Sequence, residues 1–151
     1  TPNGPKVIEY NCRFGDPETQ VVLPLLETDI MDIIEAVWEE KLDTLDIKWS
    51  DKSCACVVMA SGGYPEKYET GKVISGLDEN GQCEGAFVYH AGTKLENGKF
   101  LTAGGRVLGI TAYGDTLKEA LDTAYKAVDT ISFEKAHYRH DIGKKALSAL
   151  K

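Results

Sequence analysis

The sequence predicts an α+β chain, made of the end of one α/β domain followed by a compact β-rich domain with packed helices. Three observations predict this fold class. One strand-like segment and two helical segments fill the first 42 residues, a polar stretch follows from Asp43 to Ser53, and short strand candidates with one long amphipathic helix fill the rest. We place the domain boundary in the polar stretch and assign residues 1–48 to the first domain and 49–151 to the second.

The first domain begins with a predicted strand and a short helix. Lys6–Arg13 has the composition of a strand, and one of its faces carries the apolar side chains that we expect to be buried: Ile8, Tyr10 and Cys12. Asp16 is a suitable N-cap and Pro17 a suitable first residue for the helix that follows. Pro24 lacks an amide hydrogen and should end that helix.

A second helix is predicted next. Thr28 can cap it, and its apolar residues recur at spacings of three and four, which predicts one buried stripe. The stripe consists of Ile30, Ile33, Ile34, Val37, Trp38 and Leu42.

The second domain begins with an uninterrupted apolar strand, Cys54–Ala60, which Ser61–Pro65 closes. Four further strand candidates follow: Lys72–Gly76, Ala86–His90, Lys99–Ala103 and Val107–Ala112. The Asn97-Gly98 pair predicts a tight hairpin turn.

The sequence then predicts an amphipathic helix capped by Asp115-Thr116 and a short final helix over Asp141–Leu150. The apolar side of the first helix consists of Leu117, Ala120, Leu121, Ala124, Val128 and Ile131.

Composition restricts the classes of function. The chain has 151 residues and a net charge of −7, which disfavours nucleic acid and anionic membranes as partners. No apolar run approaches the roughly 20 residues of a membrane span, and no signal peptide is evident, so we expect a cytoplasmic protein. The four cysteines form no C-x-x-C pair, which favours reduced, buried, structural thiols over a zinc site.

Three polar residues share one face of the predicted first strand. Glu9 and Asn11 present a carboxylate and an amide oxygen side by side, which is a suitable pair of ligands for Mg²⁺ at a nucleotide site. Arg13 follows on the same face and could clamp a phosphate or a carboxylate. The spacing alone fits a solvated strand face better than a metal site, because E-x-N is a very short pattern.

Other polar positions allow two interpretations each. The helix start at Asp16-Pro17-Glu18 could bind an anion or could simply be well capped. Gly62-Gly63 and Gly104-Gly105 are typical of turns and bulges, although they could also let a ligand approach the backbone. Arg106 is the best candidate for a cofactor-binding anion contact in the second domain, whereas His90 is more simply a structural histidine.

Five runs of residues resemble one enzyme family. They are VIEYNCRFGDPETQ at 7–20, ASGGYP at 60–65, HAGT at 90–93, TAGGRVL at 102–108 and YRHDIG at 138–143. Together they span almost the whole chain and resemble the phosphoribosylamine–glycine ligase family of ATP-grasp enzymes.

The resemblance implies a fold and an activity. It implies the end of an ATP-grasp domain followed by a β-rich, biotin-carboxylase-C-like domain. It also implies a ligase that joins glycine to 5-phosphoribosylamine with ATP as co-substrate, in purine biosynthesis. Glu9 and Asn11 match the family's ligands for Mg²⁺ or Mn²⁺, and a catalytic contact of Arg13 with substrate is our own inference.

The family's chains are longer, which implies that N-terminal domains of the same chain are absent here and that this chain alone is inactive. Two alternatives stay open: another ATP-grasp carboxylate–amine ligase or carboxylase relative, and a non-catalytic β-rich interaction module.

Overall fold

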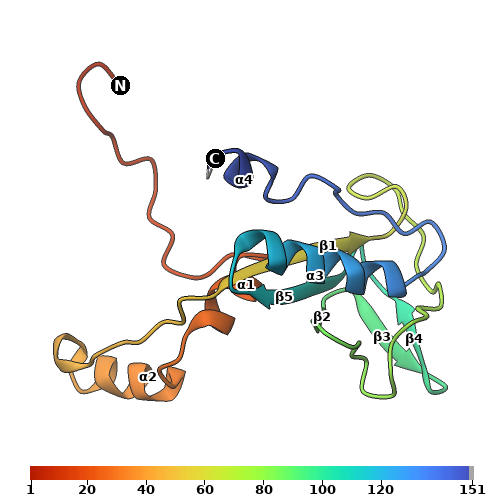
Figure 1. The fold of residues 1–151 in the computed structure, drawn as a ribbon, viewed down its shortest axis with the longest axis horizontal. Helices are drawn as coiled ribbons and strands as arrows, with labels where there is room; N and C mark the ends of the chain where they lie inside the picture. Colours follow the sequence, from red (N-terminus) through yellow and green to blue (C-terminus); the bar gives the residue numbers. More distant parts are fainter. Residues whose placement is uncertain (150–151) are drawn as a thin grey trace.

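The computed structural model describes residues 1–149 (Figure 1). The helices are α1 (Thr19–Val22), α2 (Ile30–Trp38), α3 (Leu117–Thr130) and α4 (Lys144–Ala149), with 3₁₀ turns η1 (Leu23–Leu25) and η2 (Leu42–Thr44). The strands are β1 (Ser53–Ala60), β2 (Phe87–His90), β3 (Thr93–Glu96), β4 (Lys99–Thr102) and β5 (Arg106–Gly114).

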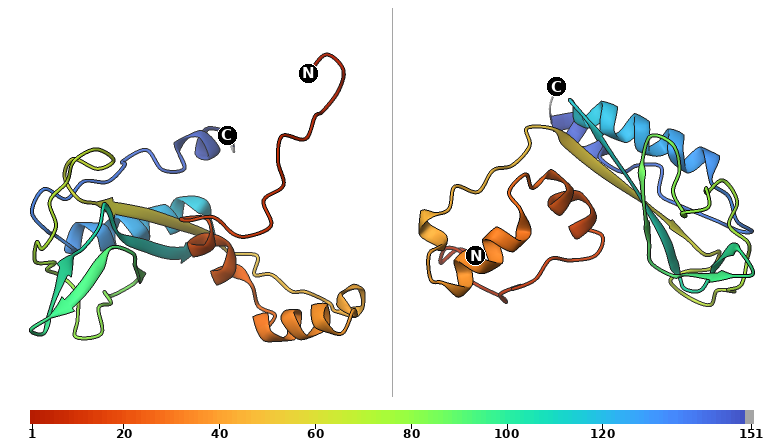
Figure 2. Two further views of the ribbon diagram at one scale, coloured as in Figure 1. Left: turned by 180° about the vertical axis from the view of Figure 1, so that it is seen from behind. Right: turned by 90° about the horizontal axis from the view of Figure 1, so that it is seen from below.

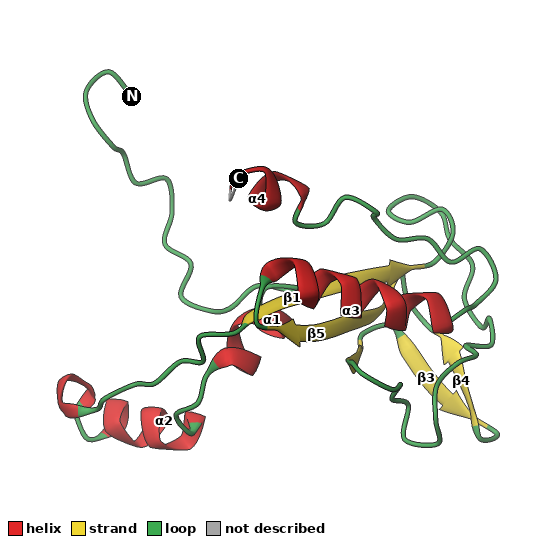
Figure 3. Ribbon diagram, in the orientation of Figure 1, coloured by secondary structure: helices red, strands yellow, loops and turns green. Residues whose placement is uncertain are grey.

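Two antiparallel sheets organise the second half of the chain (Figure 3). The larger sheet has the order β1-β5-β2, so that β5 is the central strand and Ile110 lies opposite both Val57 and Val88. The smaller sheet is the hairpin β3-β4. Asn97 and Gly98 join its strands with φ angles of 51° and 72°, which confirms the predicted tight turn.

The core lies between α3 and the larger sheet, as Figure 2 shows. Alternate residues of both strands enter it, Val57 and Met59 from β1 and Leu108, Ile110 and Ala112 from β5, because successive side chains of a strand face opposite ways. Helix α3 begins with the predicted cap, a capping box in which the Thr116 hydroxyl accepts from the Glu119 amide at 3.2 Å. The predicted apolar side of α3 is confirmed, and its buried residues are Ala120, Leu121, Ala124, Ala127 and Val128.

The predicted strand Lys6–Arg13 is wrong. Residues 1–14 are exposed and belong to no helix or strand, and the side chains of Ile8 and Tyr10 are 97% and 83% exposed. A strand is held by hydrogen bonds to a neighbouring strand, and no described strand lies beside this segment. The segment has the residue pattern of a strand, but no described strand lies beside it to accept its backbone hydrogen bonds.

The first helices differ in detail from their prediction. Helix α1 begins after Glu18, and Asp16 accepts a side-chain bond from Gln20 at 2.8 Å instead of capping the helix. The expected end before Pro24 is confirmed. Helix α2 is capped by Asp29, which accepts from the Met31 amide at 2.8 Å, and not by Thr28.

The predicted burial of the α2 stripe is also wrong. Figure 1 shows α2 projecting away from the sheet, and none of its residues is buried. Ile34 is 52% exposed and Trp38 is 88% exposed. The stripe is amphipathic as expected, but the element that α2 mainly contacts is the nearby 3₁₀ turn η2, and most of the stripe stays exposed.

Two differences affect the second domain. Lys72–Gly76 is not a strand, because it makes only isolated bridges from Val73 to Leu101 and from Ser75 to Ser132. Strand β3 was not predicted, although the other strand candidates are confirmed within two residues at their ends. The final helix begins three residues later than expected, and Leu150 lies outside the described residues.

The four cysteines are free thiols, as expected, but they are not all buried. Cys56 is buried, Cys54 and Cys83 are partly buried, and Cys12 is exposed because the segment that carries it is uncovered. Burial raises the pKa of Cys54 to about 11 and also raises that of Cys56. Among the described helices, none has the length and apolar character needed to cross a membrane.

Candidate functional site

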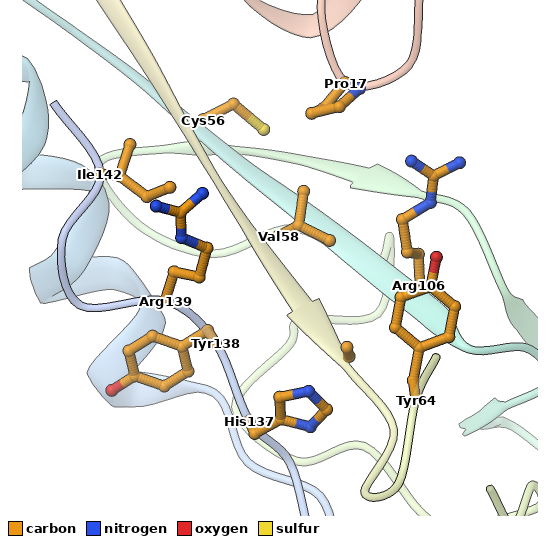
Figure 4. A pocket seen from close by; sticks show the side chains of 10 residues that line it. Pro17, Cys56, Val58, Tyr64, Arg106, His137, Tyr138, Arg139 and Ile142 are labelled. Carbon is orange, nitrogen blue, oxygen red and sulfur yellow. The ribbon is translucent and has the colours of Figure 1, made fainter. Parts of the chain in front are cut away.

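A cavity of about 290 Å³ lies against the face of the larger sheet opposite α3 (Figure 4). Its floor is formed by Cys56, Val58 and Ala60 of β1. Cys56 and Val58 face the cavity because their neighbour Val57 faces the core. Burial raises the pKa of the Cys56 thiol, which favours its neutral form beside the apolar Val58 and Ala60.

Arg106 and Tyr64 stand together at one end of the cavity (Figure 4). The Arg106 guanidinium lies 2.8 Å from the Asp16 carboxylate and also donates to the Asp16 carbonyl oxygen at 3.0 Å. These two bonds tie the turn that carries Pro17 to the first residue of β5. A Cβ atom on Gly105 would lie 2.2 Å from the Tyr64 ring, so glycine is needed there for the ring to reach the cavity.

The other end of the cavity is built by the segment after α3. The backbone of His137 pairs with Ala60 through bonds of 2.8 and 3.0 Å, which continues the edge of β1. Arg139 then holds Asp141 with two parallel bonds of 2.9 Å each. Hydrogen bonding to Arg139 lowers the pKa of the Asp141 carboxyl, so this pair stays charged near neutral pH.

The structure brings Arg106 to this cavity but does not bring Glu9, Asn11 or Arg13 there. All three lie on the exposed N-terminal segment. The Asn11 side-chain oxygen accepts from the Arg13 amide at 3.3 Å, and the Arg13 guanidinium donates to the Phe14 carbonyl at 3.1 Å. No cluster of three or more His, Cys, Asp or Glu suited to a metal occurs in residues 1–149. The metal and substrate roles of these residues stay predictions.

His90 behaves as a structural residue. Its Nδ1 lies 2.8 Å from the Thr93 hydroxyl and its Nε2 lies 2.8 Å from the Gly81 carbonyl oxygen. Both ring nitrogens are therefore engaged. Reasoning from the sequence gave no role to Tyr64 or Arg139, although both stand in the runs that carry the family resemblance, and membership of those runs was the signal that could have found them.

Comparisons with known proteins place the chain in a family. The model of the family "Phosphoribosylglycinamide synthetase, C domain" matches residues 54–145. A protein of Caldanaerobacter subterraneus named phosphoribosylamine–glycine ligase is 55% identical over 94% of this chain and 33% of its own length. The "Bifunctional purine biosynthetic protein purD" of Dictyostelium discoideum is 50% identical over 95% of this chain and 18% of its own length.

A solved structure agrees with these matches. The crystal structure of phosphoribosylamine–glycine ligase from Thermotoga maritima superposes with a TM-score of 0.70 at 33% identity, covering 89% of this chain and 32% of that chain. The chain thus spans about a third of the length of the ligases that it matches. Because the family model covers more than half of its residues, the chain belongs to the phosphoribosylglycinamide synthetase family and contains that family's small mixed helix-and-sheet C domain.

Proposed function

We propose that this chain is part of an ATP-dependent ligase that joins glycine to 5-phosphoribosylamine, giving glycinamide ribonucleotide, ADP and phosphate. The observation that carries the proposal is the 55% identity, over 94% of the chain, with a protein named phosphoribosylamine–glycine ligase. The chain spans a third of that relative, so the other contacts to ATP, glycine and ribosylamine come from the rest of the enzyme. The proposed location is the cytoplasm.

The proposed reaction has two steps. The glycine carboxylate attacks the γ-phosphorus of ATP and releases ADP, and the amine of phosphoribosylamine then attacks the resulting glycyl phosphate and releases phosphate. Such a reaction depends on holding the reactants in line and on offsetting phosphate charge. A chain that supplies only some of these positioned groups is expected to have no turnover alone.

Glu9 and Asn11 are the proposed ligands of Mg²⁺ or Mn²⁺. Their donors are oxygens, which these hard cations prefer, and both side chains are exposed. Two protein ligands leave coordination positions for water and phosphate oxygens, as is usual for a cation bound together with a nucleotide. When bound, the cation would offset charge on the phosphates.

Residues 1–48 are proposed to complete an ATP-grasp domain, and residues 49–151 to form the biotin-carboxylase-C-like domain of the ligase. Arg13 lies two residues beyond Asn11 and is proposed to contact substrate through its guanidinium. That group makes one bond, to the neighbouring Phe14 carbonyl, and most of its donors remain available.

A chimera tests the proposal. This chain replaces the matching third of the Caldanaerobacter relative, and ligation is measured with glycine, phosphoribosylamine, ATP and Mg²⁺. We expect ligation by the chimera and none by the 151-residue chain alone. Glu9→Gln and Asn11→Ala should each reduce turnover severely and raise the Mg²⁺ concentration needed, since each removes one oxygen ligand.

Glu27→Gln is the matched control, because Glu27 is an exposed carboxylate outside the proposed site and should leave turnover unchanged. A folded chimera without ligase activity would contradict the proposed function. If Glu9→Gln keeps wild-type turnover at limiting Mg²⁺, the assignment of Glu9 as a metal ligand is contradicted, whereas the proposed ligase function is not.

A further inference from the structure

The contacts of Asp16 are not those of a helix cap. Helix α1 begins after Glu18 and has no side-chain cap bond. Both carboxylate oxygens of Asp16 are engaged elsewhere: Oδ1 accepts from the side-chain amide of Gln20 at 2.8 Å, and Oδ2 lies 2.8 Å from Nη2 of Arg106. Arg106 also donates from Nη1 to the Asp16 carbonyl oxygen at 3.0 Å. We call Asp16, Gln20 and Arg106 the Asp16 joint.

The Arg106 side of the joint belongs to the sheet. Arg106 is the first residue of β5 and lies opposite Ala60 of β1. Its carbonyl oxygen accepts from the Gly92 amide at 2.9 Å, and the carbonyl of Gly105 accepts from the Ser61 amide at 2.8 Å. The guanidinium is therefore carried by a backbone that is held on both sides, and Figure 4 shows it directed towards the turn that carries Pro17.

The other side of the joint has few supports. Residues 1–14 are exposed, and the turn after them is bonded within itself: the Gly15 amide donates to the Glu18 carboxylate at 2.9 Å, and the Thr19 amide donates to the Gly15 carbonyl at 2.9 Å. Within residues 1–149, Asp16 is the only residue before α1 that hydrogen-bonds to the region from β1 onward. The joint therefore determines where the N-terminal segment meets the β-rich domain.

The proposed metal ligands lie a short distance along the chain from this joint. Asn11 and Glu9 precede Asp16 by five and seven residues. An extended chain rises about 3.3 Å per residue, so Asn11 lies within roughly 17 Å of Asp16. A displacement of Asp16 relative to β5 is thus passed on to the segment that carries both ligands.

We propose that Asp16 is a positioning residue: through Arg106 it fixes, on the β-rich domain, the end of the segment that carries Glu9 and Asn11. This inference rests on the proposed function, in which those two residues hold the metal. Asp16 is assigned no contact with metal or substrate. The side chains of Arg106 and Asp16 are 40% and 49% exposed, so the ion pair adds little to global stability and acts on geometry instead.

Backbone ¹⁵N relaxation of the 151-residue chain tests the joint. We expect order parameters of about 0.85 for the Gly15 and Glu18 amides in the wild type, and below about 0.6 in Asp16→Asn, which keeps the side-chain volume and removes the charge. Arg106→Lys keeps the charge but cannot make both contacts, so it should loosen the turn in the same way.

Asp122→Asn is the matched control for the relaxation measurement. It removes an exposed carboxylate that holds Lys118 on α3, and it should leave the Gly15 and Glu18 amides unchanged. Thermal unfolding should show that all three variants are folded, because the altered side chains are exposed or half exposed.

Kinetics of the chimera test whether the joint serves the reaction. Asp16→Asn should lower kcat at least tenfold, because a misplacement of about 1 Å can cost a hundredfold in rate. The Mg²⁺ concentration for half-maximal rate should stay unchanged, in contrast to Glu9→Gln, because both metal ligands are retained. In the Arg106→Gln background, Asp16→Asn should cause no further loss, since a residue that acts only through Arg106 then has nothing to hold.

Three results would overturn the proposal: a turn as ordered in Asp16→Asn as in the wild type, a raised Mg²⁺ requirement, or an effect on kcat that multiplies with that of Arg106→Gln. A wild-type chimera without ligase activity would instead contradict the proposed function. The relaxation measurements need neither ATP nor metal, so they decide in either case whether Asp16 fixes the turn.

Discussion

Helices α2 and α3 are both amphipathic, yet only α3 is buried. The apolar residues of α3 lie against β1 and β5, and Ala120 and Ala124 are fully enclosed. The apolar stripe of α2 is largely exposed and contributes no buried residue, although its side chains are larger. The comparison teaches that a helical pattern identifies the face that can be buried, whereas burial itself depends on a partner elsewhere in the chain.

The two regions should therefore differ in stability. Full burial of a Leu- or Ile-sized side chain contributes about 1.5–3 kcal/mol relative to exposure, and residues before β1 contribute none of the buried core. Helix α2 has nine residues, fewer than the roughly 12–15 that an isolated helix needs to be even marginally stable in water. Only the region from β1 onward has a core of its own.

Amide hydrogen exchange should show the largest difference. We expect the amides of β5 to exchange only through global unfolding, and those of α2 to exchange by local opening, at least 10³-fold faster, roughly 4 kcal/mol of opening free energy. Exchange of the intact chain measured by mass spectrometry or NMR tests this expectation. Equal protection of α2 and β5 would show that a second contact covers α2.

Truncating one isoleucine in each region should give the next largest difference, measured as the loss in free energy of unfolding. Ile110→Ala removes a side chain that is 0% exposed on the central strand and should cost about 2–5 kcal/mol of unfolding free energy. Ile34→Ala removes the same atoms from a half-exposed position and should cost less than about 1 kcal/mol. Urea unfolding monitored by circular dichroism measures both. Similar losses would mean that the α2 stripe is covered in solution.

The rates at which Cys12 and Cys54 are alkylated compare the exposure of the N-terminal segment with that of β1. Cys12 is exposed on the N-terminal segment, whereas Cys54 is partly buried with its pKa raised to about 11. At pH 8 only about one part in a thousand of Cys54 is thiolate, so iodoacetamide should modify Cys12 at least ten times faster. The Cys54 rate should still increase as pH rises towards 11. Mass spectrometry of peptides after timed quenching reads both rates, and equal rates at pH 8 would contradict the expected burial of Cys54.

The helix caps should differ by a smaller amount. Thr116→Ala removes the cap of α3 and should cost about 1 kcal/mol of global stability. Asp29→Ala removes the 2.8 Å cap bond of α2 and should leave the global transition within about 0.3 kcal/mol, because α2 does not contribute to the core. Thermal and urea unfolding compare the two variants. A full loss for Asp29→Ala would indicate that α2 unfolds together with the sheet.

Tyr10→Ala should have the smallest effect. The strand pattern predicts a core residue, for which truncation would cost roughly 3–5 kcal/mol. The structure leaves Tyr10 83% exposed, so we now expect a change within about 0.5 kcal/mol. The free energy of unfolding of this variant, measured beside that of the wild type, decides between the large and the small cost. A loss above about 2 kcal/mol would mean that residues 1–14 pack on the rest of the protein.

The candidate site was only partly predictable. Arg106, which follows a glycine pair in the sequence, lines the cavity, and its role as an anion contact stays a prediction. The pairing of Arg106 with Asp16 was not predictable, since 90 positions separate the two residues. Tyr64 and Arg139 reach the same cavity only because the turn after β1 and the segment after α3 fold back towards it.

The sequence by itself determined the elements whose signals are local. The Thr116 cap, the Asn97-Gly98 turn and the apolar run of β1 act within a few residues, and the structure confirms each of them. Tertiary structure decided what is buried. Ile8 and Ile34 have patterns as apolar as those of Val57 and Val128, but only the latter two meet a partner. The physical reason is that hydrophobic burial and strand pairing are interactions between segments. The residues of one segment determine which face can be buried or paired, and whether it is buried or paired depends on the segments that lie beside it.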